Sequence, residues 1–353
     1  SKGGRKDRID AVHARILARL WYKTAMKLRL LSAAEVRSAM PMAEAIRAVR
    51  QAFVELSAGR ATMPVRARVD VPSRSGISLY MPGYLAGAHQ LATKIVGIFP
   101  ENLTRNPPLP TINALVVVLD PDTGLPAGAM HGGVLTAIRT GAASGVATEE
   151  LARDDVRTAG VLGAGVQART QLEAMVTARP GIESASVFDP RTEVAESFAK
   201  DMTELLGIPV SALPSADEVV SRSEVIAEAT TSYTPVFSDS ALRDDAHLNA
   251  IGSFTPDMQI IPEATVVRSA VVVDHRESCW EETGDLIQPR DRGAITEDHI
   301  LAEIGEIAAG TAPRPEHGPT LFKTVGTAVQ DVAVGAAALA RAAEHDLGTV
   351  VEL

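Results

Sequence analysis

Hydrophobic and polar positions change their spacing along the chain, and the first change separates a helix from a sheet. Apolar side chains recur at helical spacing from Val36 to Phe53, and Ser32-Ala33-Ala34-Glu35 before them resembles a capping box. Residues 63–120 then hold alternating and apolar runs separated by Pro, Gly and Asn, which is typical of strands. This part of the chain predicts a helix followed by an antiparallel or mixed sheet.

The pattern turns helical again over residues 134–152, where small side chains predominate and allow a helix to pack closely between two domains. Short apolar runs then alternate with helical stretches from residue 158 to residue 273, which predicts parallel βαβ units. An Ala-rich stretch over residues 321–345 predicts a long final helix. The fold class is therefore α/β, with a second unit built around the earlier sheet.

Composition excludes several classes of protein. The chain has 353 residues, 46% of them hydrophobic, which is long enough for about two domains. Its single cysteine, Cys279, excludes a disulfide framework and predicts a cytoplasmic location. The net charge of -10 argues against nucleic acid as a partner, and no apolar run is long enough to span a membrane. No pair of histidines has metal-ligand spacing, so we expect no metal site.

The amino-terminal segment differs from the rest of the chain. Residues 1–28 carry eight Lys and Arg side chains against two Asp. A targeting segment or a basic arm is one interpretation, although an apolar core typical of a secretory signal is missing. We favour the other interpretation, in which residues 1–25 are a tail or non-native extension and Met26 begins the native chain.

A glycine-rich turn is the strongest local indication of chemistry. Gly163-Ala164-Gly165-Val166-Gln167-Ala168 follows a predicted strand and opens a predicted helix, so Gly163 permits the turn and Gly165 lets a pyrophosphate approach. Asp189 ends the next strand, where a carboxylate accepts from ribose hydroxyls, although it could instead be a turn residue. The turn predicts dinucleotide binding. Asp189 favours NAD, and Arg191 beside it leaves NADP possible.

Four stretches together resemble the ornithine cyclodeaminase/mu-crystallin family: residues 135–144 (LTAIRTGAAS), 163–168 (GAGVQA), 247–253 (HLNAIGS) and 322–326 (FKTVG). The resemblance covers the chain from residue 26 to the C-terminus. It implies a Rossmann NAD(P)-binding domain, residues 149–320, inserted in a mixed-sheet α+β domain that binds substrate and forms a homodimer. Residues 26–148 and 321–353 would make up that second domain, completed by the C-terminal helix.

The resemblance also implies roles for individual residues. Arg66, Lys94 and Arg139 match positions that bind a substrate carboxylate, which suits the charge and geometry of arginine and lysine. Thr111 and Val325 match further substrate contacts. The cofactor positions, beyond Gly163, Gly165, Ala168, Asp189 and Arg191, are Thr140, Val166, Gln167, Thr230, Asn249, Ile251 and Thr324.

Two departures from the family pattern bear on the reaction. Phe254 stands where cyclodeaminases place a catalytic Asp, and Met258 replaces a Lys, so ornithine cyclisation is not expected. Phe254 would either line an apolar substrate pocket or pack in the core, and Asp257 is a weaker substitute for the missing acid. His131 stands where relatives often carry an acid. It could donate a proton or bind a polar substrate tail, or it could simply be satisfied by the backbone.

The sequence therefore predicts an NAD(P)-dependent oxidoreductase of small α-amino or α-imino acids, for example a reductase of pyrroline- or piperideine-2-carboxylate. Lys94 and His131 are its predicted catalytic residues. A non-redox lyase of the same family, of the hydroxyproline dehydratase or cyclodeaminase type, is the first alternative. A non-catalytic nucleotide-binding protein, as in the crystallin role, is the second.

Overall fold

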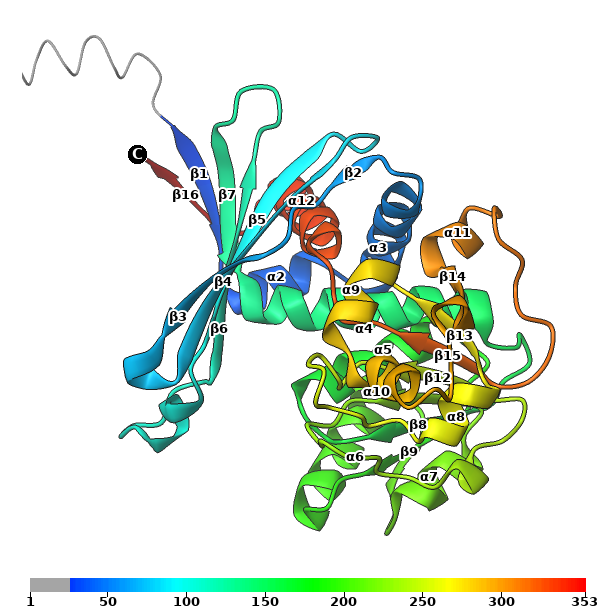
Figure 1. The fold of residues 1–353 in the computed structure, drawn as a ribbon. Coiled ribbons are helices and arrows are strands. Elements are labelled where there is room, and N and C mark those ends of the chain that lie inside the picture. Colours follow the sequence, from blue (N-terminus) through cyan, green and yellow to red (C-terminus); the bar gives the residue numbers. More distant parts are fainter. Residues whose placement is uncertain (1–25) are drawn as a thin grey trace, which may run out of the picture.

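Two β-sheets, each with its own helices, form the two parts of the molecule in the computed structural model (Figure 1). The structure describes residues 26–353, so the basic segment interpreted as a tail lies outside the described residues. The chain builds most of the first sheet, then the whole second sheet, and returns to the first with its last helix and strand. This mixed α/β architecture confirms the predicted fold class.

The first sheet is mixed, because β1 pairs parallel to β7 while its other pairs are antiparallel. Its order is β16 (Thr349–Glu352), β1 (Lys27–Leu31), β7 (Pro126–His131), β6 (Ile112–Leu119), β5 (Gln90–Ile98), β4 (Gly76–Leu85) and β2 (Ala61–Thr62), with β3 (Ala67–Val71) also paired to β4. The strands predicted between residues 63 and 120 are all present.

Helices cover one face of this sheet. They are α2 (Ala33–Ala39), α3 (Met42–Ser57), α4 (Gly132–Leu151) and α12 (Ala328–Glu344). The capping box of Ser32 and Glu35 is present. The single helix predicted around Val36–Phe53 is in fact two, because Pro41 lacks the backbone donor that a continuing helix requires.

The second sheet is parallel throughout, in the order β10 (Val210–Ala212), β9 (Ser184–Phe188), β8 (Thr158–Leu162), β11 (Val225–Glu228), β12 (His247–Ala250), β15 (Thr320–Lys323), β13 (Ala270–Val273) and β14 (Ile300–Glu303). Residues 321–323, predicted to begin the final helix, are instead part of β15 in this sheet. The chain thus leaves the parallel sheet after Lys323, slightly beyond the predicted boundary at residue 320.

The remaining helices all lie in the chain segment that builds the parallel sheet. They are α5 (Val166–Ala178), α6 (Thr192–Leu206), α7 (Ala216–Arg222), α8 (Glu263–Arg268), α9 (Arg276–Glu282), α10 (Gly284–Asp291) and α11 (Ile304–Ala308). Short 3-10 turns occur at Pro72–Arg74, Pro100–Thr104, Asp239–Ala241 and Glu297–His299. None of the helices within residues 26–353 is long and apolar enough to cross a membrane.

Helix α4 lies between the two parts and joins their cores, as its small residues predict (Figure 1). Side chains from α3, α5, α12 and the parallel sheet share one hydrophobic cluster with it. A Cβ on Gly141 would lie 2.5 Å from the Thr170 carbonyl oxygen of α5, and one on Gly145 would lie 2.5 Å from Ile46 of α3. Glycine at position 141 therefore sets how closely α4 approaches α5 of the other part, and glycine at position 145 sets how closely it packs against α3.

We predict that Gly141→Ala destabilises the protein although alanine favours helices. The added methyl group meets a backbone oxygen that cannot move aside, so we expect a loss of about 1–3 kcal/mol in the free energy of unfolding. Thermal unfolding followed by circular dichroism measures the effect. Gly181→Ala is the matched control, because its nearest neighbour lies 3.4 Å away, and equal unfolding temperatures for the two variants would contradict the prediction.

Candidate active site

The predicted cofactor residues gather at one edge of the parallel sheet. Strands β8, β11, β12 and β15 are neighbours, and all four end at this edge because they are parallel. Gly163, Thr230, Ile251 and Thr324 follow these strands within two residues of their ends. Ligands of open parallel sheets bind outside the carboxyl ends of the strands. The sequence prediction therefore coincides with the edge where the fold places a ligand.

The glycine-rich turn has the geometry that an anion site requires. Gly163 adopts φ +90°, and a Cβ on it would lie 2.8 Å from the Ala229 carbonyl oxygen. Gly165 caps α5 without a side-chain hydrogen bond, and no atom lies within 4 Å of where its Cβ would be. Ala168 is fully buried against the sheet. The first backbone N–H groups of α5 are therefore open to a pyrophosphate, so the turn fits a dinucleotide.

Asp189 is held at the end of β9 by Arg191. The arginine Nε donates to Oδ1 at 2.9 Å and its Nη2 donates to Oδ2 at 3.0 Å, while the Ala164 N–H donates to Oδ2 at 3.1 Å. These hydrogen bonds, that of the Arg191 side chain above all, lower the pKa of Asp189 below its usual value. Asp189 is buried, whereas the Arg191 side chain is 68% exposed. The pair thus fits a carboxylate that accepts from ribose hydroxyls and an exposed cation that could contact a 2′-phosphate.

The other predicted cofactor residues differ in the burial and hydrogen bonding of their side chains. Asn249 is fully buried, accepts from His247 and donates to Thr148 of α4, so its side chain joins the sheet to that helix. Thr324 is also buried and donates to Asp274 at 2.5 Å. By contrast, Val166 is largely exposed at the start of α5. Thr140, Gln167, Thr230 and Ile251 are partly exposed.

A buried ion cluster joins the predicted carboxylate-binding residues. Asp331 of α12 contacts Lys94 of β5, with Nζ 2.7 Å from Oδ2, and Arg139 of α4, with Nε 3.2 Å from Oδ1. Gln330 accepts from Nη1 of Arg139 at 3.2 Å. Gly326, at φ +81°, lies so close to Arg139 that a Cβ would be 2.4 Å from Nη1. The two cations are therefore fixed beside the loop that joins β15 to α12.

Lys94 is set up for proton transfer by its surroundings. It is 3% exposed, and burial together with the positive charge of Arg139 lowers the pKa of Lys94 to about 8, although the Asp331 carboxylate opposes the shift. A lysine in this range is mostly protonated at neutral pH and still able to donate. The buried cluster can therefore both bind an anion and supply a proton.

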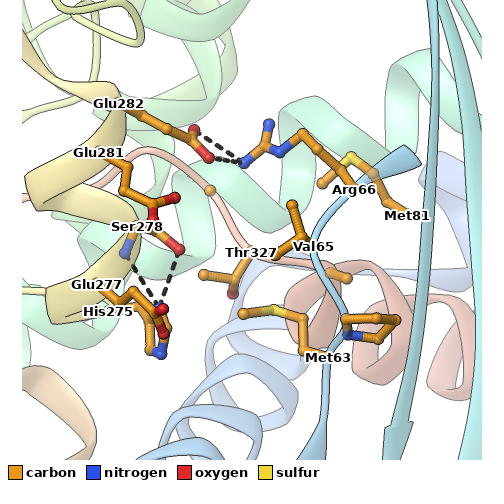
Figure 2. A pocket seen from close by; sticks show the side chains of 13 residues that line it. Met63, Val65, Arg66, Met81, His275, Glu277, Ser278, Glu281, Glu282 and Thr327 are labelled. Atoms are coloured by element: carbon orange, nitrogen blue, oxygen red, sulfur yellow. Dashed lines mark hydrogen bonds and ion pairs between the residues drawn. The ribbon is translucent and has the colours of Figure 1, made fainter. Parts of the chain in front are cut away.

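A pocket adjoins this cluster, between the two parts of the molecule (Figure 2). Arg66, in the loop between β2 and β3, lines it together with Gly326 and Met81. Met81 is directly opposite Lys94 in the β4–β5 pairing, so the two share a sheet face. Across the pocket, α9 contributes Glu282, whose carboxylate contacts Arg66 at 2.8 Å. The pocket thus brings Arg66, a predicted substrate residue, close to Gly326, which follows β15 and lies against Arg139.

His131 is not brought to this site within one subunit. The register pairs Lys94 with Val116 and Val116 with Met130, so these three share a face. His131 is the next residue and points to the opposite face, because side chains alternate along a strand. It is exposed and accepts the Val134 N–H at 3.2 Å as the cap of α4. Of the two interpretations, the structure supports satisfaction by the backbone.

Three other predicted substrate contacts, Thr111, Phe254 and Val325, form no hydrogen bond or ion pair with the cluster of Lys94, Arg139 and Asp331 within residues 26–353. Thr111 accepts from Phe99, five residues from Lys94, or roughly 16 Å along the strand. Phe254 is 53% exposed, so the expectation that it packs in the core is wrong, whereas Met258 is buried. Val325 packs beside the core of the parallel sheet. Asp257 is exposed and accepts from Thr255, which gives it no place beside Lys94 or Arg139 in this structure.

Two residues that the structure places at the site were missed from the sequence. Asp331 is the only acidic residue between residues 328 and 343 of the Ala-rich stretch, and a carboxylate in so apolar a helix signals a buried partner. That signal could have identified it. Glu282 lies 216 residues from Arg66 along the chain, and no local pattern connects the two.

We predict that Arg191→Ala weakens binding of NADPH by about tenfold while changing that of NADH little. The exposed guanidinium is the cation available to a 2′-phosphate, whereas the ribose hydroxyls need only Asp189. Fluorescence titration with each nucleotide measures the two dissociation constants. Arg169→Ala, which removes another exposed arginine that pairs with an aspartate, is the control. Equal weakening of both nucleotides by Arg191→Ala would contradict the prediction.

Comparison with known proteins gives a consistent picture. The family model described as "Ornithine cyclodeaminase/mu-crystallin family" matches residues 26–345. A Δ1-pyrroline-2-carboxylate reductase of Bacillus cereus is 36% identical over 326 residues, covering 92% of this chain and 99% of that protein.

Solved structures of similar proteins lead to the same family. The Δ1-pyrroline-2-carboxylate reductase of Thermococcus litoralis, in complex with NADH and L-proline, is 41% identical with a TM-score of 0.87, over 92% of this chain and all of that one. An archaeal alanine dehydrogenase dimer with bound NAD is 31% identical with a TM-score of 0.84, over 92% of this chain and 99% of that one. The chain therefore belongs to the ornithine cyclodeaminase/mu-crystallin family.

Proposed function

We propose that this protein is an NAD(P)H-dependent reductase of cyclic α-imino acids, with Δ1-pyrroline-2-carboxylate as substrate and proline as product. The observation that carries the proposal is the charge at the site. Within residues 26–353, Lys94, Arg139 and Arg66 form ion pairs with two carboxylates, Asp331 and Glu282. When all five are ionised the group has one positive charge in excess, which suits a substrate with one carboxylate. The names of the relatives support the same substrate.

When bound, the reduced nicotinamide supplies the hydride for the carbon of the C=N bond. Arg139 and Arg66 would hold the substrate carboxylate, and this fixes the imine carbon relative to the cofactor edge. Lys94 would give a proton to the imine nitrogen, because an imine accepts hydride well only when it is protonated. The Lys94 Nζ then regains its proton from solvent. His131, on the other face of the sheet, takes no part in this step.

The absence of an acid at position 254 distinguishes this chemistry from ornithine cyclisation. Phe254 provides no carboxylate for a distal amine, and Asp257 is exposed and bound to Thr255. The wall formed by Met63, Val65 and Met81 suits the methylene groups of a small ring. These features favour a pyrroline ring over a diamino acid.

We also propose a homodimer that forms through the open face of the first sheet. Val69, Tyr80 and Leu115 are exposed on the face opposite Lys94, in positions set by the register of β3 to β6. An apolar sheet face of this kind is typical of a protein interface. His131 lies on this face too, so a second copy would cover it. A cytoplasmic location stays a prediction from the sequence.

The proposed activity is tested by NADH and NADPH oxidation at 340 nm with Δ1-pyrroline-2-carboxylate, with proline measured as product. We expect stoichiometric conversion, and a loss of activity in Lys94→Met of about 100-fold or more. Pyrroline-2-carboxylate formed by loss of water from 3-hydroxyproline, without consumption of nucleotide, would instead establish the lyase. Nucleotide binding without turnover of either compound would establish a non-catalytic protein.

The pH dependence gives a second prediction. Because kcat/KM reports the free enzyme, it should fall as the pH rises through about 8 and Lys94 loses its proton. The Asp331 carboxylate raises the pKa of Lys94, so Asp331→Asn should move this fall to lower pH by about one unit. Lys94→Arg, which stays charged, should be slower but lack the fall near pH 8. A fall that stays in place in both variants would assign it to another group.

A further inference from the structure

One wall of the pocket is acidic and the other is apolar. Glu277, Glu281 and Glu282 of α9 line the acidic wall, while Met63 and Val65 lie on the opposite side (Figure 2). Arg66 reaches between the two walls and contacts Glu282. A predicted substrate-binding arginine therefore already holds a protein carboxylate in this structure.

The contact between Arg66 and Glu282 has the features of an exchangeable pair. One nitrogen, Nη2, lies 2.8 Å from Oε1 and 2.9 Å from Oε2 of Glu282, and Nη1 and Nε donate to no other group within residues 26–353. The side chains are 28% and 25% exposed, and ion pairs open to water contribute little to stability. The pair also bridges the two parts of the molecule, since Arg66 follows β2 and Glu282 ends α9. A substrate carboxylate with a better fork geometry can replace Glu282.

Additional negative charge is unfavourable beside the acidic wall. Burial raises the pKa of Glu282, Arg66 opposes that shift, and the negative charges of Asp274 and Glu281 add to it. Once Arg66 turns to a substrate carboxylate, Glu282 loses its partner while its acidic neighbours remain. A second carboxylate on the substrate would then face like charge, which is strongly unfavourable in a partly desolvated pocket.

Building on the proposed function, we propose that Glu282 is a specificity-determining residue, which yields Arg66 to the carboxylate of the substrate and excludes substrates with a second carboxylate. The first carboxylate gains Arg66 beside the cluster of Lys94 and Arg139. The remainder of the substrate lies between the apolar and acidic walls, where methylene groups are accepted and an anion is not. The pocket thus selects imino acids that carry one negative charge.

Two ring compounds that differ only in one carboxylate test this proposal: Δ1-piperideine-2-carboxylate and Δ1-piperideine-2,6-dicarboxylate. The quantity measured is the ratio of their kcat/KM values with NADH. Glu282→Gln should lower the preference for the monocarboxylate by about tenfold or more, chiefly through KM of the dicarboxylate. Glu282→Asp, which keeps the charge, should retain most of the wild-type preference. Glu281→Gln is the matched comparison, because it neutralises the adjacent residue of the same wall without touching Arg66, and we expect it to change the ratio by less than Glu282→Gln does.

An unchanged ratio in Glu282→Gln would overturn the proposal, and so would an equal change in Glu281→Gln. A wild-type enzyme that reduces neither compound would contradict the proposed function instead. The specificity is then measured without turnover, by calorimetric titration of the enzyme and NADH with L-proline and with pyrrolidine-2,5-dicarboxylate. Glu282→Gln should selectively strengthen binding of the dicarboxylate, and equal affinities in wild type and variant would again overturn the proposal.

Discussion

The buried carboxylate of Asp331 is the interaction on which the rest of the site depends. Lys94 and Arg139 are both nearly inaccessible to water, and an unpaired buried cation costs several kcal/mol. Asp331 compensates both, and it comes from a helix at the far end of the chain. The C-terminal helix must therefore return to the sheet that the N-terminal half has built. Electrostatics and hydrophobic packing select the same discontinuous arrangement.

The path of the chain from β15 to α12 also places the ion cluster near the edge of the parallel sheet where the cofactor residues lie. Strand β15 lies inside the parallel sheet, and only Thr324–Thr327 separate it from α12, which carries Asp331. Gly326 makes this short connection possible, because its positive φ and missing side chain leave room for Arg139. Only these four residues separate the edge of the parallel sheet, where the dinucleotide turn lies, from the helix whose Asp331 pairs with Lys94 and Arg139.

Prediction from the sequence succeeded where local pattern decides the structure. The alternation predicted from residue 158 onward is present, and its first two strands, Thr158–Leu162 and Ser184–Phe188, are apolar runs between clear turn signals. It failed for β15, a strand of four residues that only its neighbours in the sheet stabilise, next to an Ala-rich helix that dominates the local pattern. The face on which His131 lies depends on register across three strands, and periodicity does not reveal it. The partners of Lys94 and Arg66 come from residues more than 200 positions away, so the cations could be identified and their counter-charges could not.

These counter-charges differ in a way that bears on catalysis. Asp331 is buried and holds two cations, so its removal would leave both uncompensated, and it cannot be exchanged for a substrate. Glu282 is partly exposed and holds one nitrogen of one arginine. In the proposed binding mode, a substrate carboxylate competes only against the weaker of the two pairs, while the stronger one keeps Lys94 and Arg139 in place. Separating the permanent counter-ion from the exchangeable one lets the site stay folded without substrate and still present a cation when substrate arrives.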